Sequence, residues 1–80
     1  MKIKYKEYGE IQSIDTIKGE VTIANREDLE NTETYYYDGT LQSTLEELFE
    51  LGVNVKAWIK IEANSNKTIY KVEDNTPEED

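Results

Sequence analysis

The stretch "GEIQSIDTIKGEVTI" (residues 9–23) joins two β-prone runs through a turn. In the second run, residues 20–24 (EVTIA), apolar and polar side chains alternate, as they do in a strand that buries one face. Residues 15–19 (DTIKG) have the Asp and Gly typical of a turn. Gly9 opens the first run and permits a sharp bend or bulge. The stretch therefore predicts two strands joined by a turn, the first of them bent.

The same alternation recurs along the chain. Residues 2–8 (KIKYKEY) place Ile3 and Tyr5 on one face and lysines on the other, and this strand is expected to run on through Gly9. Three further strands are predicted at residues 32–38 (TETYYYD), 53–63 (VNVKAWIKIEA) and 68–72 (TIYKV). These segments are aromatic or β-branched or alternate with a period of two, and turn residues precede or follow each of them.

One segment has a helical period instead. Leu45, Leu48 and Phe49 are spaced so that they share one face of a short helix, and Gly52 follows where a C-cap belongs. Two pairs of residues have the spacing of a capping box: Ser43 with Glu46, and Thr44 with Glu47.

Five strands with a short helix between the third and the fourth predict an all-β fold. An open sheet would leave its edges exposed and half of the apolar residues uncovered, whereas a small barrel plugged by the helix avoids both problems. A five-stranded OB-type barrel has this element order, and an SH3-like barrel is the alternative. We expect one barrel domain at residues 1–73 and a disordered acidic tail at residues 74–80 (DNTPEED).

Composition excludes several kinds of function. The 80-residue chain has a formal net charge of −9 and contains neither Cys nor His. The commonest general base and the best side-chain nucleophile are therefore missing, and no spacing of acidic residues matches a known metal loop. No run of residues is long enough to span a membrane, and the N-terminus does not resemble a signal peptide. We expect a cytoplasmic protein that is not an enzyme, with no cofactor, metal or membrane partner.

Residues 9–72 resemble a cold-shock domain, a small OB barrel. Its opening scaffold positions match without a gap: Gly9, Ile11, Gln12, Asp15, Lys18, Gly19 and Ile23. The segments "ELGVNVKAW" and "NSNKTIYKV" resemble the family's later strands. The resemblance implies that outward aromatic rings on the first three strands stack on single-stranded bases. In this chain, however, the expected rings are replaced by Ser13, Ile14, Glu20 and Thr22, and only "YYY" at 35–37 keeps them.

Trp58 is the sharpest single candidate. Period two places it on the polar face between Lys56 and Lys60, where it suits stacking a base or anchoring a partner; alternatively it covers one end of the barrel or packs under the N-terminal strand. The basic row of Lys2, Lys4 and Lys6 either neutralises phosphates or protects an edge strand.

Two hypotheses follow. The first is a small acidic module that binds and regulates or inhibits another protein, such as a nucleic-acid-binding protein with a basic groove, as acidic proteins of phages and other mobile elements do. The second is weak binding of single-stranded DNA or RNA. The register of the third strand stays open, so that either Tyr36 alone or Tyr35 and Tyr37 face outward. The candidate binding face comprises Glu20, Thr22, Tyr35, Tyr36, Tyr37, Lys56, Trp58 and Lys60. The candidate acidic surface comprises Glu27, Asp28, Glu30 and Glu33.

Overall fold

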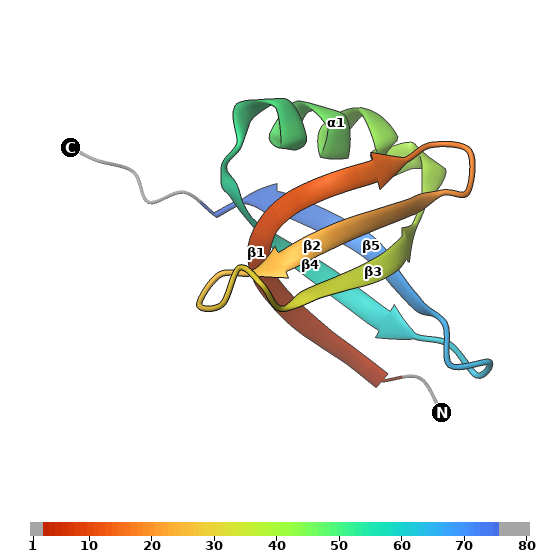
Figure 1. The fold of residues 1–80 in the computed structure, drawn as a ribbon. Helices are drawn as coiled ribbons and strands as arrows, with labels where there is room; N and C mark the ends of the chain where they lie inside the picture. The colour runs from red at the N-terminus through yellow and green to blue at the C-terminus, as the bar shows by residue number, and fades with distance from the viewer. Residues whose placement is uncertain (1–2, 76–80) are drawn as a thin grey trace.

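Alternating apolar residues form five strands that close into a ring in the computed structural model, which describes residues 3–75 (Figure 1). The elements in chain order are β1 (Ile3–Asp15), β2 (Glu20–Asn25), β3 (Thr32–Tyr37), the 3₁₀ helix η1 (Gly39–Leu41), α1 (Gln42–Leu51), β4 (Asn54–Ile61) and β5 (Lys67–Asp74). The strands follow the order β1-β2-β3-β5-β4 around the barrel. The predicted all-β barrel with a helix between the third and fourth strands is confirmed.

Neighbouring strands are antiparallel except β3 and β5, which run parallel. The parallel contact is short, pairing Tyr36 with Thr68 and Tyr37 with Ile69. None of the helices within residues 3–75 has the length and apolarity needed to cross a bilayer.

β1 belongs to both halves of the barrel, and it changes partner around Gly9 and Glu10, which are paired on both sides. The strand pairs with β4 from Ile3 onward and with β2 towards Asp15. A Cβ atom on Gly9 would lie 2.0 Å from the carbonyl oxygen of Ala24 and 2.8 Å from Cγ2 of Ile23. No side chain fits at these distances, so glycine is required by the close approach of two backbones. β1 curves strongly along its length (Figure 1), as predicted, but the register shift of the β1–β2 pairing lies between Ile11 and Ser13 and not at Gly9.

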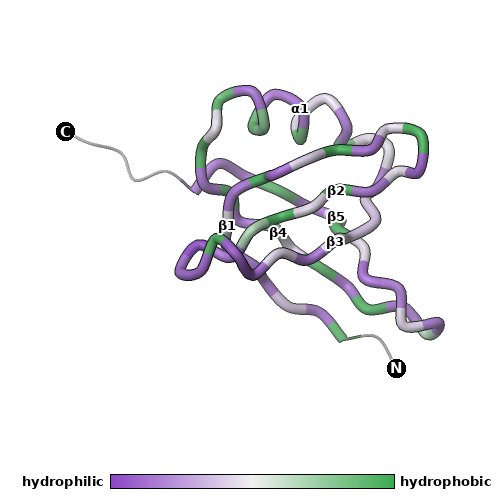
Figure 2. The backbone as a smooth tube through the Cα atoms, in the orientation of Figure 1, coloured by the Kyte–Doolittle hydropathy of each residue, from purple (hydrophilic) through white to green (hydrophobic). Residues whose placement is uncertain are grey.

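The barrel interior holds one apolar cluster. Its buried members come from every strand and from α1: Ile11, Val21, Ile23, Tyr35, Tyr37, Leu45, Leu48, Val55, Ala57, Ile59, Ile69 and Val72. Figure 2 shows how apolar and polar residues interchange along the strands. The alternating runs 20–24 and 53–63 thus bury an apolar face, with Val21, Ile23, Val55, Ala57 and Ile59 inside the barrel.

α1 covers the barrel with fewer residues than predicted. Leu45 and Leu48 are buried, but Phe49 is 41% exposed, so the predicted three-residue apolar face is wrong at Phe49. At the other end of the helix, Gly52 adopts the left-handed conformation (φ 67°) and donates its N–H to the carbonyl oxygens of Leu48 and Phe49. This C-cap is confirmed.

The start of the helix differs from the prediction. Neither capping-box pair forms, because α1 begins at Gln42 and its N-cap residue, Leu41, makes no side-chain cap. Asp38 caps the preceding turn instead: its Oδ1 accepts hydrogen bonds of 2.9 Å from both the N–H and the hydroxyl of Thr40. Ser43 and Thr44, which were expected to cap, lie inside the helix.

The last strand extends slightly past the predicted domain boundary. Asp74 is the final residue of β5, and the N–H of Asn75 donates to the carbonyl oxygen of Asn54 at 2.8 Å. The rest of the predicted tail, residues 76–80, lies outside the described residues.

The substitution Gly9→Ala tests the close approach of the two backbones. It should lower the free energy of unfolding by about 3 kcal/mol, because the new methyl group can be placed only by moving the β2 backbone. Urea unfolding followed by circular dichroism measures the change. Gly39→Ala is the matched control, since a Cβ there meets nothing within 4 Å, and it should leave stability unchanged or slightly higher. Equal stability of the two variants would contradict the assignment of Gly9.

Candidate functional site

The tyrosine cluster of β3 divides between the core and the surface. Tyr36 is 44% exposed, whereas Tyr35 and Tyr37 are only 1% and 9% exposed. The strand pairing explains this, because Tyr35 lies opposite the inward residue Val21 and Tyr36 lies opposite Glu20. The open register is thus resolved in favour of Tyr36 alone, and the inclusion of Tyr35 and Tyr37 in the binding face is corrected: both rings fill the core.

The outer face of β2 and β3 is poor in features that hold a nucleic-acid strand. The hydroxyls of Thr22 and Thr34 bond to each other at 2.9 Å, and Glu20 stands beside Tyr36. Tyr36 is the single exposed ring among the described residues of these two strands. A base stacked on it would bring phosphate near a carboxylate, so this face does not supply the chemistry that the cold-shock resemblance implies.

A second surface, on the other side of the barrel, is very different. The outward residues of β4 lie between those of β1 and β5, with Lys6 opposite Trp58 and Trp58 opposite Lys71. We call this surface the lysine face. It consists of Lys4, Lys6, Tyr8, Lys56, Trp58, Lys60, Tyr70 and Lys71. Its five lysines are more than half of the nine basic residues in the chain.

Trp58 lies at the centre of the lysine face. The ammonium groups of Lys71, Lys56 and Lys6 are 4.6, 5.3 and 5.7 Å from its ring centroid. At exposed positions each such cation–π contact is worth about 0.5–1 kcal/mol. The ring is half-buried on the outer surface, with Ala57 and Ile59 on either side in sequence pointing into the core. Trp58 is therefore outward, as period two predicts, and does not cover an end of the barrel.

The other two rings of the lysine face also lie near ammonium groups. Lys4 is 5.5 Å from the ring centroid of Tyr70, and Lys56 is 5.9 Å from that of Tyr8. Lysine stems can cover aromatic carbon while the charged ends stay in water. The lysine face is thus a surface of three rings with cations above or beside each.

The lysine face keeps a local positive charge in an acidic protein. Glu62 is 3.2 Å from Lys60 and Glu73 is 4.0 Å from Lys71. The five lysines of the face outnumber these two glutamates, although the whole chain carries −9. Ion pairs at exposed positions are weak, so the lysines can exchange these partners for others.

The predicted acidic surface separates into two parts. Glu27, Asp28 and Glu30 are exposed in the loop between β2 and β3, where Asn25 and Asp28 side chains accept backbone N–H groups and shape the turn. Glu33 does not belong with them. It forms an ion pair with Lys67 and accepts a hydrogen bond of 3.2 Å from the hydroxyl of Tyr35. Its inclusion is corrected, because its charge is matched within the fold; the hydrogen bond to Glu33 also raises the pKa of Lys67.

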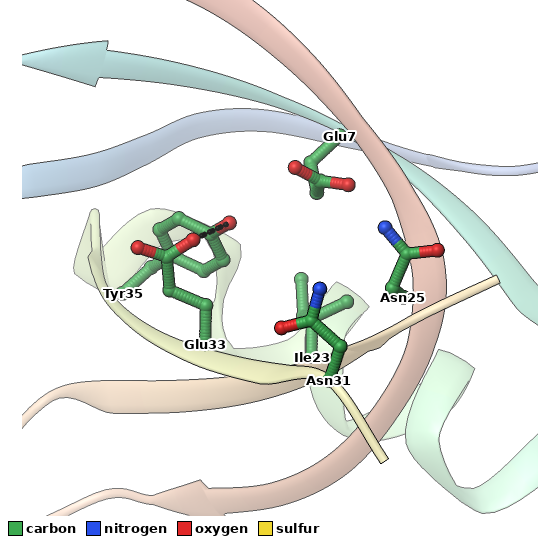
Figure 3. A pocket seen from close by; sticks show the side chains of 6 residues that line it. All are labelled: Glu7, Ile23, Asn25, Asn31, Glu33 and Tyr35. Carbon is green, nitrogen blue, oxygen red and sulfur yellow. Dashed lines mark hydrogen bonds between the residues drawn. The ribbon is translucent and has the colours of Figure 1, made fainter. Parts of the chain in front are cut away.

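Glu33 lies at a small opening in the barrel. Figure 3 shows its carboxylate, that of Glu7 and the amides of Asn25 and Asn31 around a cavity that Ile23 and Tyr35 complete. The cavity volume is about 40 Å³. That volume suits a few water molecules rather than an organic cofactor. The described part of the chain contains no group of three or more His, Cys, Asp or Glu side chains that could hold a metal ion.

Comparison with known proteins gives no match: no family model, curated protein or solved structure is significantly similar to this chain. The candidate site therefore rests on the chemistry of its own residues.

Sequence reasoning found five of the eight residues of the lysine face. Lys56, Trp58 and Lys60 were predicted from period two, and Lys4 and Lys6 from the basic row of β1, whose first member, Lys2, lies outside the described residues. Lys71, Tyr8 and Tyr70 were missed. Lys71 reaches Trp58 only because the β4–β5 register shifts between Trp58 and Ile59, and nothing in the local sequence marks that bulge.

The phenol of Tyr35 should make stability depend on alkaline pH. Burial is the main cause that raises the pKa of Tyr35, and Tyr5 and Glu33 nearby raise it further. In the unfolded chain the phenol ionises near pH 10. Neutral Tyr35 therefore contributes fully to the free energy of unfolding below that pH. This contribution is lost as the pH rises towards the higher pKa of the folded state, by up to about 1.4 kcal/mol per pH unit.

Urea unfolding between neutral pH and pH 11 measures this effect. Above pH 10 the free energy of unfolding of Tyr35→Phe should fall less steeply than that of the wild type, although the variant is less stable at neutral pH. Tyr36→Phe, which alters an exposed ring, is the control and should follow the wild-type slope. Identical slopes for all three proteins would contradict the assignment.

Proposed function

We propose that the protein is a non-enzymatic binding module that holds a polyanion on its lysine face. The observation that carries the proposal is the outward Trp58 with three lysine ammonium groups around its ring. Clustered lysines attract phosphate or carboxylate polymers through local potential, which an opposite net charge elsewhere does not cancel at close range.

We also propose an OB-type barrel as the scaffold. The ring order β1-β2-β3-β5-β4, the parallel contact of β3 with β5 and the position of α1 before β4 support it. In this scaffold the proposed binding face lies on β1, β4 and β5, whereas the cold-shock resemblance implies a face formed by the first three strands.

A heparin column tests polyanion binding with matched variants. Wild-type protein should be retained at low salt and eluted by added salt despite its net charge of −9. Lys6→Glu and Lys71→Glu should each elute at clearly lower salt. Lys18→Glu changes the total charge by the same amount at the exposed turn after β1, and should elute close to wild type. Passage of the wild type without retention, or equal shifts for all three variants, would refute the proposal.

A second candidate function, the binding of a basic protein, is favoured by the exposed acids of the β2–β3 loop. Glu27, Asp28 and Glu30 are exposed together in this loop, whose shape is held by the backbone N–H groups that the Asn25 and Asp28 side chains accept. An acidic surface of this kind complements the basic groove of a nucleic-acid-binding protein, which the module would regulate or inhibit.

Pull-downs with charge-reversed variants test the second candidate. Wild-type bait should recover a basic protein at low salt and lose it at high salt. A triple variant with Lys in place of Glu27, Asp28 and Glu30 should fail to recover the basic protein. A matched triple variant, with Lys in place of Glu46, Glu47 and Glu50 on α1, should still do so. Recovery of no partner by the wild type, or its loss in both triple variants, would exclude the loop as the binding surface.

A further inference from the structure

We infer that the polyanion held by the lysine face is a single-stranded nucleic acid with one base stacked on Trp58. This inference rests on the proposed polyanion-binding function of the same face and narrows its ligand to one chemical class. The rings narrow the choice of ligand, because lysines alone would bind any polyanion.

The three rings of the lysine face form a diagonal row. Tyr8 on β1 is paired with Lys56, so it is the diagonal neighbour of Trp58 on β4, at a spacing of about 7–8 Å. Tyr70 continues the row on β5, next to Lys71, which is paired with Trp58. Lysines flank this row on both sides, with Lys4 near Tyr70 and Lys56 near Tyr8. A row of rings bordered by cations fits a strand whose bases and phosphates lie side by side.

Trp58 must be uncovered before a base can stack on it. Its ring lies within 4.6–5.7 Å of three ammonium groups. Loss of one exposed cation–π contact lowers affinity roughly 2- to 5-fold, whereas a base stacked on an aromatic side chain raises it roughly 5- to 150-fold. A lysine that leaves the ring also gains a phosphate. Exchange of one lysine for a base on Trp58, with the other two lysines still beside the ring, is therefore favourable.

The same geometry disfavours two other polyanions. In a duplex the base faces are stacked on each other, so only phosphates would reach this convex sheet surface and the rings would contribute nothing. An acidic peptide would likewise engage the lysines and leave Trp58 without a stacking partner. Single strands alone among these ligands use both the cations and the rings.

The test is fluorescence anisotropy of labelled oligo-dT with full-length protein at low salt. Competitors are an abasic oligomer and a duplex of equal length, polyphosphate and polyglutamate. Wild-type protein should prefer oligo-dT to each competitor. Trp58→Leu should bind oligo-dT about 10-fold more weakly and polyphosphate equally well, with an unchanged circular dichroism spectrum. Tyr36→Leu, which removes the exposed ring of β3, is the matched control and should bind oligo-dT as the wild type does.

The outcomes separate the two levels of the proposal. If oligo-dT, abasic oligomer and polyphosphate bind equally and Trp58→Leu has no effect, polyanion binding stands and the single-strand inference falls. Tighter binding of polyglutamate would make the ligand an acidic protein, and tighter binding of duplex would make it double-stranded. Loss of oligo-dT binding in Tyr36→Leu but not in Trp58→Leu would move the site to β3. No binding of any polyanion would overturn both proposals.

Discussion

The close contact between the backbones at Gly9 and Ala24 is the constraint on which the barrel depends. A Cβ at Gly9 would stand 2.0 Å from the Ala24 carbonyl oxygen, so only glycine fits at this position, where β1 is paired with both β2 and β4. Because one strand serves both halves, the sheet closes without a further element. The contact also fixes which side of β1 faces outward, since Lys4, Lys6 and Tyr8 alternate with inward positions up to the glycine.

The core and the lysine face both follow from the alternation of inward and outward residues along β4. Val55, Ala57 and Ile59 are fully buried, so Lys56, Trp58 and Lys60 on the same strand must point out. β1 and β5 then bring their own outward lysines against this strand. A cluster of positive charge in a chain of net charge −9 therefore arises where β1 pairs with the hairpin of β4 and β5, which lies far from it in sequence. The buried residues of β4 thus determine which of its side chains point outward into the lysine face.

Much of the fold could be predicted because period two is a local property. The strands, the curve of β1 and the C-cap at Gly52 each depend on residues close together in sequence. The errors concern features that depend on distant partners or on local competition. Ser43 and Thr44 do not cap the helix, because the chain already turns at Asp38, whose carboxylate accepts hydrogen bonds from Thr40. Glu33 is neutralised by Lys67, 34 residues away, and the position of Lys71 beside Trp58 depends on a bulge between strands.

The division of the aromatic residues explains why the candidate site lies on β4 rather than on β3. Tyr35 and Tyr37 are among the core residues of the barrel, and the hydroxyl of Tyr35 is held by Glu33, so neither ring is free to turn outward. Alternation then leaves β3 one exposed ring, Tyr36, beside a carboxylate. On β4 the inward positions are aliphatic and the aromatic residue is outward, between lysines of two other strands. Exposed aromatic rings and positive charge therefore lie together on β1, β4 and β5. On β2 and β3 the exposed ring of Tyr36 lies beside a carboxylate instead.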